Sequence, residues 1–139
     1  MDEIIVGVDE SATAKIAATQ AAELALQTGK PLHLVMALKR RQASTFQAGA
    51  ERVVIDNISL GEDFLRSLKG ELPGGMNATH AVMMKDPADA LCYEAERLGA
   101  SMIVVGNRRV QGVTRVLGSI PLDVAKQAPC NVYIVHTTG

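Results

Sequence analysis

The fold is decided by one stretch of the chain, Ser101-Met-Ile-Val-Val-Gly106-Asn-Arg-Arg-Val-Gln-Gly112-Val-Thr-Arg-Val-Leu-Gly118-Ser119. Its first six residues form an apolar run that predicts a buried strand, and Ser119-Ile-Pro-Leu-Asp predicts the first turn of a helix capped by Ser119. The stretch also holds three glycines and three arginines. Glycine lets a backbone approach a ligand, and a helix N-terminus presents unpaired N–H groups, so we expect a phosphate cradle. It follows neither the GxxxxGK(S/T) nor the GxGxxG pattern.

Length and composition exclude several classes of protein. We expect the 139 residues to fold as one domain, 1–139, and their 47% apolar content indicates a globular chain. A formal net charge of −1, with two Tyr, two Phe and no Trp, argues against a nucleic-acid partner. No apolar run reaches the ~18 residues of a membrane span, and the N-terminus lacks a signal-peptide pattern. We therefore expect a cytoplasmic protein with no membrane partner.

Cysteine and histidine are not spaced for metal binding. Cys92 and Cys130 belong to no CxxC motif, so we expect reduced, buried thiols. His33, His80 and His136 fall in strand patterns, where we expect packed or edge residues. The sequence also lacks a GxSxG nucleophile elbow. It therefore predicts no metal site and no catalytic residue.

Strands and helices alternate along the chain. Short apolar runs predict strands at 3–8, 31–38, 78–84, 101–106 and 131–136. Helical spacing, caps and stops predict helices from the Ser11 cap to Leu26, at about 50–69, from the Asp86 cap and Pro87 to Gly99, and at 119–127. Residues 39–49 are polar and without periodicity, and we expect a surface loop there.

This alternation predicts an α/β fold with a doubly wound, five-stranded parallel sheet in the order 3-2-1-4-5 and helices on both faces. The winding direction reverses between the first and fourth strands, and ligands of such folds bind outside the carboxyl ends of the strands at that switch point. Asp9 follows the first strand, and Gly106 ends the fourth. The glycine stretch and this carboxylate are therefore expected to line one crevice.

Each candidate residue has a structural alternative. Asp9 can accept hydrogen bonds from a ribose hydroxyl or an adenine amine, or it can cap a turn. Gly118 and Ser119 can receive a phosphate, or serve as a plain turn and an N-cap. The loop arginines suit a polyphosphate but can equally be solvated: Arg108, Arg109 and Arg115.

Three parts of the chain resemble the universal stress protein family, in a small single-domain form of the actinobacterial type. They are Ile4-Ile-Val-Gly-Val-Asp-Glu-Ser11, Asp86-Pro-Ala-Asp-Ala-Leu91, and a C-terminal third with Met102-Ile-Val-Val-Gly-Asn107, Leu117-Gly-Ser-Ile-Pro121 and Ala128-Pro-Cys-Asn-Val-Tyr-Ile-Val135. The resemblance implies the same five-stranded fold and a homodimer paired through the last strand, 131–136. It also implies ATP binding in one branch of the family, whereas another branch lacks ATP and some members bind cyclic AMP.

The resemblance further implies ligand contacts. ATP-binding members carry Gly, two residues, Gly, nine residues and Gly-Ser/Thr; Gly106 matches the first position and Gly118-Ser119 the last pair. Arg109 replaces the second glycine and the segment is one residue shorter, so its guanidinium can take over backbone contacts. We expect Lys85, where a glycine is frequent, at the crevice mouth. Family positions imply an adenosine site lined by Val8, Asp9, Ala37, Val105 and Ile120.

The leading hypothesis is a regulatory module that binds an adenine nucleotide and acts as a dimeric stress sensor. ATP is the first candidate, with cyclic AMP or AMP as alternatives and with or without Mg²⁺. The expected nucleotide contacts are Val8, Asp9, Ala37, Val105, Gly106, Arg108, Arg109, Gly118, Ser119 and Ile120. The alternative is a dimeric interaction protein with a degenerate nucleotide site. A phosphohydrolase is the third reading, and we expect at most slow ATP hydrolysis.

Overall fold

The structure is a computed structural model, and it describes residues 2–9, 11, 13–38, 50–75, 77–107 and 118–137. These residues form a five-stranded sheet in the order β3-β2-β1-β4-β5, with each neighbouring pair parallel. The predicted α/β fold and its strand order are thereby confirmed. The predicted surface loop at 39–49 lies outside the described residues.

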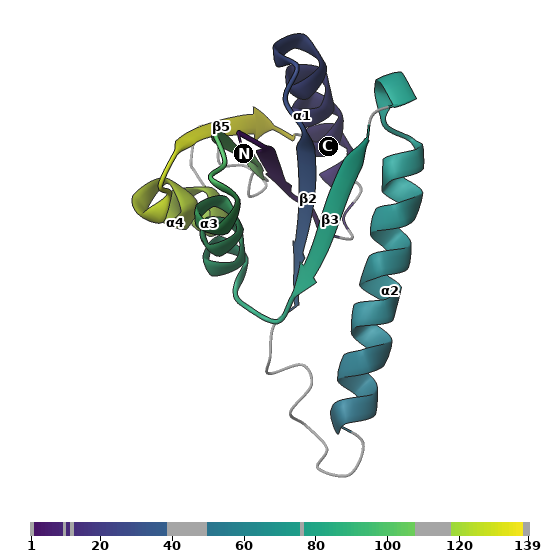
Figure 1. Cartoon of the computed structure of the whole chain (residues 1–139). Coiled ribbons are helices and arrows are strands. Elements are labelled where there is room, and N and C mark those ends of the chain that lie inside the picture. The colour runs from purple at the N-terminus through teal and green to yellow at the C-terminus, as the bar shows by residue number, and fades with distance from the viewer. Residues whose placement is uncertain are drawn as a thin grey trace.

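The elements follow the predicted alternation (Figure 1). The strands are β1 (Ile4–Gly7), β2 (Leu32–Ala37), β3 (Ala78–Met83), β4 (Met102–Asn107) and β5 (Asn131–His136). The helices are α1 (Ala14–Thr28), α2 (Ala50–Gly70), α3 (Pro87–Leu98) and α4 (Ser119–Gln127), and a 3-10 turn, η2 (Pro73–Gly75), precedes β3. Strand β5 has its predicted bounds, and the other strands end within one residue of theirs.

Two predicted helix caps are wrong. Ser11 does not cap α1, because its backbone N–H and its hydroxyl both hydrogen-bond the carboxylate of Asp9, and the N-cap position falls to Thr13. Ser119 is the first residue of α4, which leaves Gly118 at the N-cap. The start of α3 is as predicted, with Asp86 at the N-cap and a proline in the first turn.

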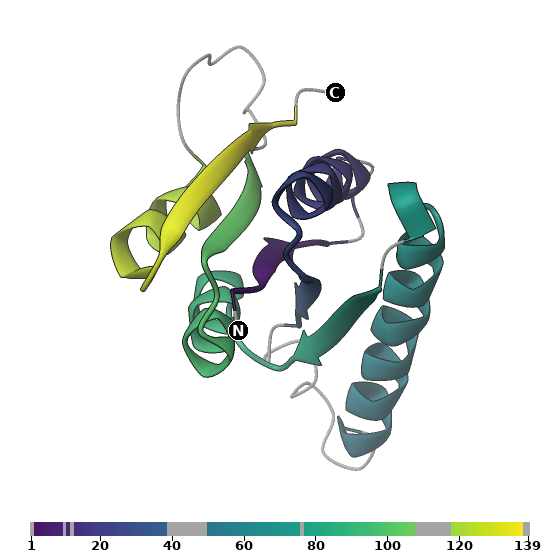
Figure 2. The ribbon, with the colours of Figure 1, turned by 45° about the horizontal axis from the view of Figure 1, so that its top comes forward.

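The helices form two layers, with α1 and α2 on one face of the sheet and α3 and α4 on the other (Figures 1 and 2). Successive strand residues point to opposite faces, so Ile4 and Val6 pack in the core under α1 and α2, whereas Ile5 packs under α3. All three side chains are buried. Burial on both faces explains why β1 is a continuous apolar run rather than an alternating one.

Small residues let the helices lie close to the central strands. The buried residues of α1 are all alanines: Ala14, Ala17, Ala18, Ala21, Ala22 and Ala25. On the opposite face, a Cβ added to Gly7 would lie 2.9 Å from Cδ1 of Leu91, so α3 packs directly on β1. Both helices begin at the carboxyl ends of the strands they follow, and their first turns therefore flank the end of β1.

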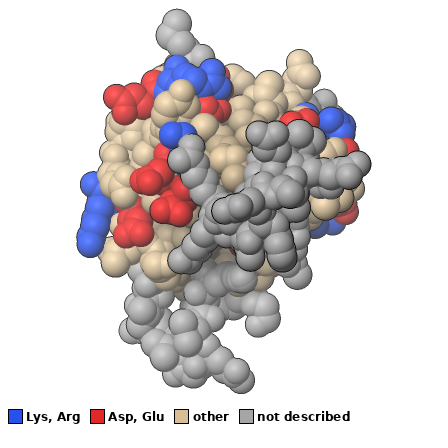
Figure 3. All heavy atoms as spheres, turned by 90° about the horizontal axis from the view of Figure 1, so that it is seen from below, with Lys and Arg blue, Asp and Glu red and all other residues tan. Residues whose placement is uncertain are grey.

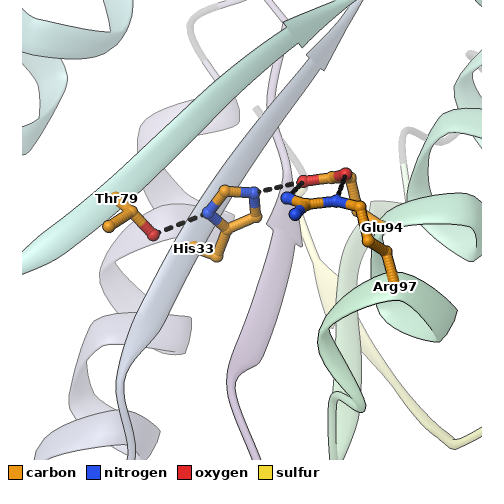
Figure 4. A network of polar contacts seen from close by, with 4 residues as sticks. All are labelled: His33, Thr79, Glu94 and Arg97. Carbon is orange, nitrogen blue, oxygen red and sulfur yellow. Dashed lines mark hydrogen bonds and ion pairs between the residues drawn. The ribbon is translucent and has the colours of Figure 1, made fainter. Parts of the chain in front are cut away.

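A buried polar network ties β2, β3 and α3 together (Figure 4). His33 on β2 contacts Oε2 of Glu94 through Nε2 at 2.7 Å and Oγ1 of Thr79 through Nδ1 at 2.6 Å. Arg97 donates to both carboxylate oxygens of Glu94, at 2.7 and 2.8 Å. The His33 and Glu94 side chains are 6% and 3% exposed, so the predicted packing of His33 is confirmed.

The charge of Glu94 is stabilised by its neighbours. The hydrogen bonds from Arg97 hold the pKa of Glu94 below its ordinary value, desolvation opposes them, and the bond to His33 adds to the lowering. Because the folded pKa lies below the unfolded one, this contribution to stability is complete above the ordinary pKa and is lost as the pH falls through the folded pKa.

The Glu94→Gln variant is expected to be less stable by about 1–3 kcal/mol near neutral pH, since an amide cannot replace charge-assisted bonds to Arg97 and His33. Urea denaturation from about pH 7 to about pH 3.5 measures the difference, which should shrink below pH 4.5, the ordinary pKa of a glutamate. Glu96→Gln, at an exposed position of the same helix, is the control and should track the wild type. A difference that stays constant across the range would contradict this prediction.

Candidate functional site

The described residues enclose a cavity of about 550 Å³ outside the carboxyl ends of β1, β2 and β4. This volume lies within the ~300–1,000 Å³ typical of small-molecule sites. Its position is the switch point of the sheet, since β1 pairs with β2 on one side and with β4 on the other. Segments distant in sequence meet there: the ends of these strands, the first turns of α1, α3 and α4, and Thr137 after β5.

Every predicted contact residue that the structure describes lines this cavity. They are Val8, Asp9, Ala37, Val105, Gly106, Gly118, Ser119 and Ile120. The other two, Arg108 and Arg109, lie outside the described residues, as do Gly112 and Arg115. The convergence of Asp9 with the two ends of the glycine stretch, which the topology predicts, is therefore present in the fold.

One part of the lining is apolar. Val35 and Ala37 on β2, Val105 on β4, and Pro87 and Leu91 on α3 contribute carbon surface. Val105 is 2% exposed and is held in the core beneath α3 and α4. A cavity of this kind can accept a flat apolar ring between a strand end and a helix.

The turn after β1 forms the acidic part of the lining. Asp9 Oδ1 accepts a 2.9 Å hydrogen bond from the backbone N–H of Ser11 and a second from its hydroxyl. Ser11 Oγ also lies 3.0 Å from Oγ1 of Thr13. These bonds fix the Asp9 carboxylate in orientation, while Oδ2 accepts from none of the described residues. The site thus presents an oriented acceptor to a ligand.

The two ends of the glycine stretch are joined by a side chain. The backbone N–H of Gly118 donates a 2.7 Å hydrogen bond to Oδ1 of Asn107, the last residue of β4. Asn107 is 5% exposed, which shields this bond from water. The bond fixes where α4 begins relative to β4, even though the residues between are not described.

The first turn of α4 therefore offers fewer donors than an ordinary helix. The Gly118 N–H is already used, Pro121 has no N–H, and the Leu122 N–H donates to the Gly118 carbonyl at 3.2 Å. A helix leaves its first N–H groups without internal partners, and among the described residues those of Ser119 and Ile120 have none, so they can face a ligand. Two converging N–H groups with the Ser119 hydroxyl suit one anionic group.

Thr137 and Gly106 form the wall of the cavity beside β4 and β5. A Cβ added to Gly106 would lie 2.9 Å from Cγ2 of Thr137 and 3.6 Å from Cβ of Ala17. The absence of a side chain at Gly106 therefore makes room for Thr137 itself. Thr137 is 2% exposed, and its hydroxyl has no hydrogen-bond partner among the described residues.

Lys85, which we predicted at the mouth of the crevice, is not among the lining residues that the structure describes. Its ammonium group lies 4.6 Å from the centre of the Tyr93 ring on α3, in a cation–π contact. Acidic and basic side chains both lie on the end of the molecule where β2 and β3 finish (Figure 3).

The cysteines differ from expectation in one respect. Cys92 and Cys130 are free thiols, as predicted, but they are half-buried rather than buried. Burial raises the pKa of both thiols, and the nearby Cys130 contributes to the raised pKa of Cys92.

Within the described part of the chain, no cluster of three or more His, Cys, Asp or Glu side chains could hold a metal ion. Nor does any described helix combine the length and hydropathy that crossing a bilayer requires.

The model of the universal stress protein family matches residues 1–136. Two universal stress proteins of Mycobacterium tuberculosis are 38% identical to this chain over 66 residues. That match covers 47% of this chain and 45% of each relative, so it spans about half the length of the relatives.

Two solved structures extend the likeness over the whole fold. A universal stress protein in complex with cyclic AMP superimposes with a TM-score of 0.67 at 24% identity, covering 98% of this chain and 97% of its own. The universal stress protein of Archaeoglobus fulgidus in complex with dAMP gives a TM-score of 0.64 at 23% identity, covering 96% and 97%. At 24% and 23% identity, the similarity to these two structures shows a shared fold.

Two residues of this site escape prediction from the sequence. Asn107 directly follows Gly106, but nothing in its neighbourhood signals a partner at Gly118, eleven positions further on. Thr137 lies beyond the last apolar run, where a threonine looks like the start of a tail. Its approach to Gly106 follows from the β4–β5 register, in which Gly106 pairs with Val135 and Asn107 with His136.

The Asn107→Ala variant is expected to be less stable by about 1–3 kcal/mol, because it leaves the Gly118 N–H without its buried partner. Chemical denaturation of the variant and the wild type measures the loss. Asn131→Ala, at an exposed position of the neighbouring strand, is the control and should change stability by less than about 0.5 kcal/mol. Equal losses in the two variants would show that the bond to Gly118 contributes nothing measurable.

Proposed function

The chain belongs to the universal stress protein family, and from this premise we propose that it is a regulatory module that binds an adenine nucleotide in the cavity at the switch point. The observation that carries the proposal is the convergence, in one cavity, of an oriented carboxylate, an apolar wall and the N-terminus of a helix. Asp9, Ala37 and Ser119 represent these three features, and each comes from a different part of the chain.

The order of the strands suggests how the ligand lies. The apolar wall belongs to β2 and α3, Asp9 follows β1, and Gly118 and Ser119 lie beyond β4. Neighbouring strands are ~4.8 Å apart, so these features succeed one another along the end of the sheet. We place the adenine against Ala37 and Leu91, the ribose at Asp9, and the phosphate at Ser119. This direction keeps the phosphate away from the like-charged carboxylate.

The relatives support adenine as the base. One solved structure of similar fold is a complex with cyclic AMP and another a complex with dAMP, and both ligands carry one phosphate. The two free N–H groups at the start of α4 also suit one phosphate group. ATP remains within the proposal, because the sequence offers Arg108 and Arg109, whose charge has the sign that further phosphates require.

We propose binding and regulation rather than catalysis. Asp9 is the one carboxylate among the described lining residues, and one of its oxygens already accepts two bonds from Ser11. The other oxygen can hold Mg²⁺ through water if a polyphosphate supplies the remaining ligands. The residues described here fit such a companion ion, but not a metal site built by protein side chains alone.

Adenine nucleotides are expected to raise the melting temperature of the protein. Ligand at 100 times its Kd adds about 2.7 kcal/mol to the free energy of unfolding, and a thermal-shift titration with ATP, ADP, AMP and cyclic AMP detects this. In Asp9→Asn the turn to Ser11 keeps an acceptor while the free acceptor oxygen becomes a donor, so affinity should fall about tenfold or more.

Asp123→Asn on α4 is the matched control, because this exposed aspartate is not a lining residue, and it should bind as the wild type does. No shift with any of the four nucleotides at millimolar concentration would exclude the proposal. It would favour the alternative, an interaction protein whose nucleotide site is degenerate.

We also propose that the protein forms a homodimer through β5. This strand pairs with β4 on one side and forms the edge of the sheet on the other (Figure 2). An edge strand presents unpaired backbone groups to another chain. Tyr133 on β5 is 41% exposed, so its ring on this edge strand is available for burial against a second copy.

Tyr133→Glu is expected to shift the protein from dimer to monomer at micromolar concentration, because two carboxylates would meet across the interface. Light scattering coupled to size-exclusion chromatography measures the mass. Tyr93→Glu is the matched control, since Tyr93 is 50% exposed on α3 and should leave the mass unchanged. A wild-type monomer at all concentrations would overturn the proposed dimer.

A further inference from the structure

We propose that the hydroxyl of Thr137 is a ligand contact, and that it donates a hydrogen bond to the phosphate of the bound nucleotide. This inference rests on the proposed function and adds a contact from the end of β5 to a site otherwise built from the ends of β1, β2 and β4. Three observations carry it: the burial of the hydroxyl, the space made for Thr137 by Gly106, and its place in the cavity.

The hydroxyl of Thr137 is buried without a partner. The residue is 2% exposed, and among the described residues its Oγ1 is one of the few buried side-chain oxygens or nitrogens that make no hydrogen bond. An unsatisfied buried hydroxyl costs free energy, so valine, which has the same shape, would be more stable there. Thr137 is a lining residue of the cavity, and its hydroxyl is closed to solvent in the free protein; a phosphate that enters beside Thr137 would supply the missing bond.

The fold keeps this threonine in place through close packing. The methyl group of Thr137 fills the space that a side chain on Gly106 would occupy, with 2.9 Å between that Cγ2 and the added Cβ. Ala17 of α1 lies beside the same spot, at 3.6 Å. A buried side chain that packs this closely against the backbone of Gly106 is limited in its rotamers, so its oxygen is held in a defined position before ligand binds.

The charges around the cavity favour the phosphate as the acceptor. Asp9, the one carboxylate in the described lining, follows β1, whereas Thr137 follows β5, two strands further along the order β1-β4-β5. A phosphate is repelled by the Asp9 carboxylate and attracted by the free N–H groups of Ser119 and Ile120. Thr137 belongs with these donors, because β5 is adjacent to β4 and Asn107 of β4 holds the start of α4.

Thr137→Val is the test, with Thr79→Val as the matched control. Both variants replace a hydroxyl by a methyl group. Thr79 lies outside the cavity lining and its hydroxyl already has a protein partner, His33 Nδ1 at 2.6 Å. Calorimetric titration of the full chain with adenosine, AMP, cyclic AMP and ATP gives the affinities, and thermal denaturation without ligand gives the stabilities.

We expect Thr137→Val to bind the three phosphorylated ligands about tenfold or more weakly, because hydrogen bonds to charged groups are the strong ones. Its affinity for adenosine should stay within about twofold of the wild type, and its melting temperature without ligand should be equal or higher. Thr79→Val should bind as the wild type does and melt at a lower temperature.

Three results would overturn the inference while leaving the proposed function standing. They are unchanged affinity of Thr137→Val for all ligands, an equal loss with adenosine, and a loss of stability without ligand as large as that of Thr79→Val. The last would show that the hydroxyl has a partner within the protein. If the wild type binds none of the nucleotides, the proposed function fails, and the inference fails with it.

Discussion

The structure depends on the parallel pairing of β1 with β4 at the centre of the sheet. Ile4, Ile5 and Val6 pair with Met102, Ile103 and Val104, and the chain winds away from this pair in opposite directions. Crossovers on both sides place helices on both faces, and neither layer can cover the gap that opens where the winding reverses. The cavity is therefore a consequence of the topology, and it is lined by the residues that follow β1 and by those at the end of β4.

Close packing makes this topology usable as a site. The alanines of α1 and the contact between Gly7 and Leu91 bring two helices onto the central strand from opposite faces. Larger side chains at these positions would crowd the close contacts between the helices and β1. The buried hydrogen bond between His33 and Glu94 acts at a different place, where it fixes α3 against β2. Helix α3, which contributes to the apolar wall, is thus held against the sheet by a polar contact as well as by its buried apolar side chains.

The sequence predicts those parts of the site that depend on periodicity and strand order. Alternating apolar runs and caps are local signals, and the handedness of crossovers converts them into the convergence of Asp9 with Gly106 and Gly118. Contacts between residues that are distant in the sequence depend on the folded positions of two segments, and no local sequence pattern predicts them. Asn107 and Gly118 are bonded although they lie eleven positions apart in the sequence, and Thr137 meets Gly106 through the register of β5 on β4. The prediction of Ser119 as the cap is wrong for the same reason. Gly118 is the N-cap of α4, and its position is fixed by the bond to Asn107.

The polar groups of the cavity are not arranged for stability. Outside the cavity, the buried side chains of His33 and Glu94 satisfy one another, whereas Nδ1 of His80 is buried without a hydrogen-bond partner among the described residues. In the cavity, one oxygen of Asp9, the N–H groups of Ser119 and Ile120 and the hydroxyl of Thr137 have no partner among the described residues. If Thr137 served only to pack the core, valine would fill the same space without leaving a buried hydroxyl unsatisfied. Unsatisfied groups that gather on one cavity, fixed by satisfied neighbours, are what a pre-organised binding site requires, because the ligand then supplies the missing bonds without reorganising the protein.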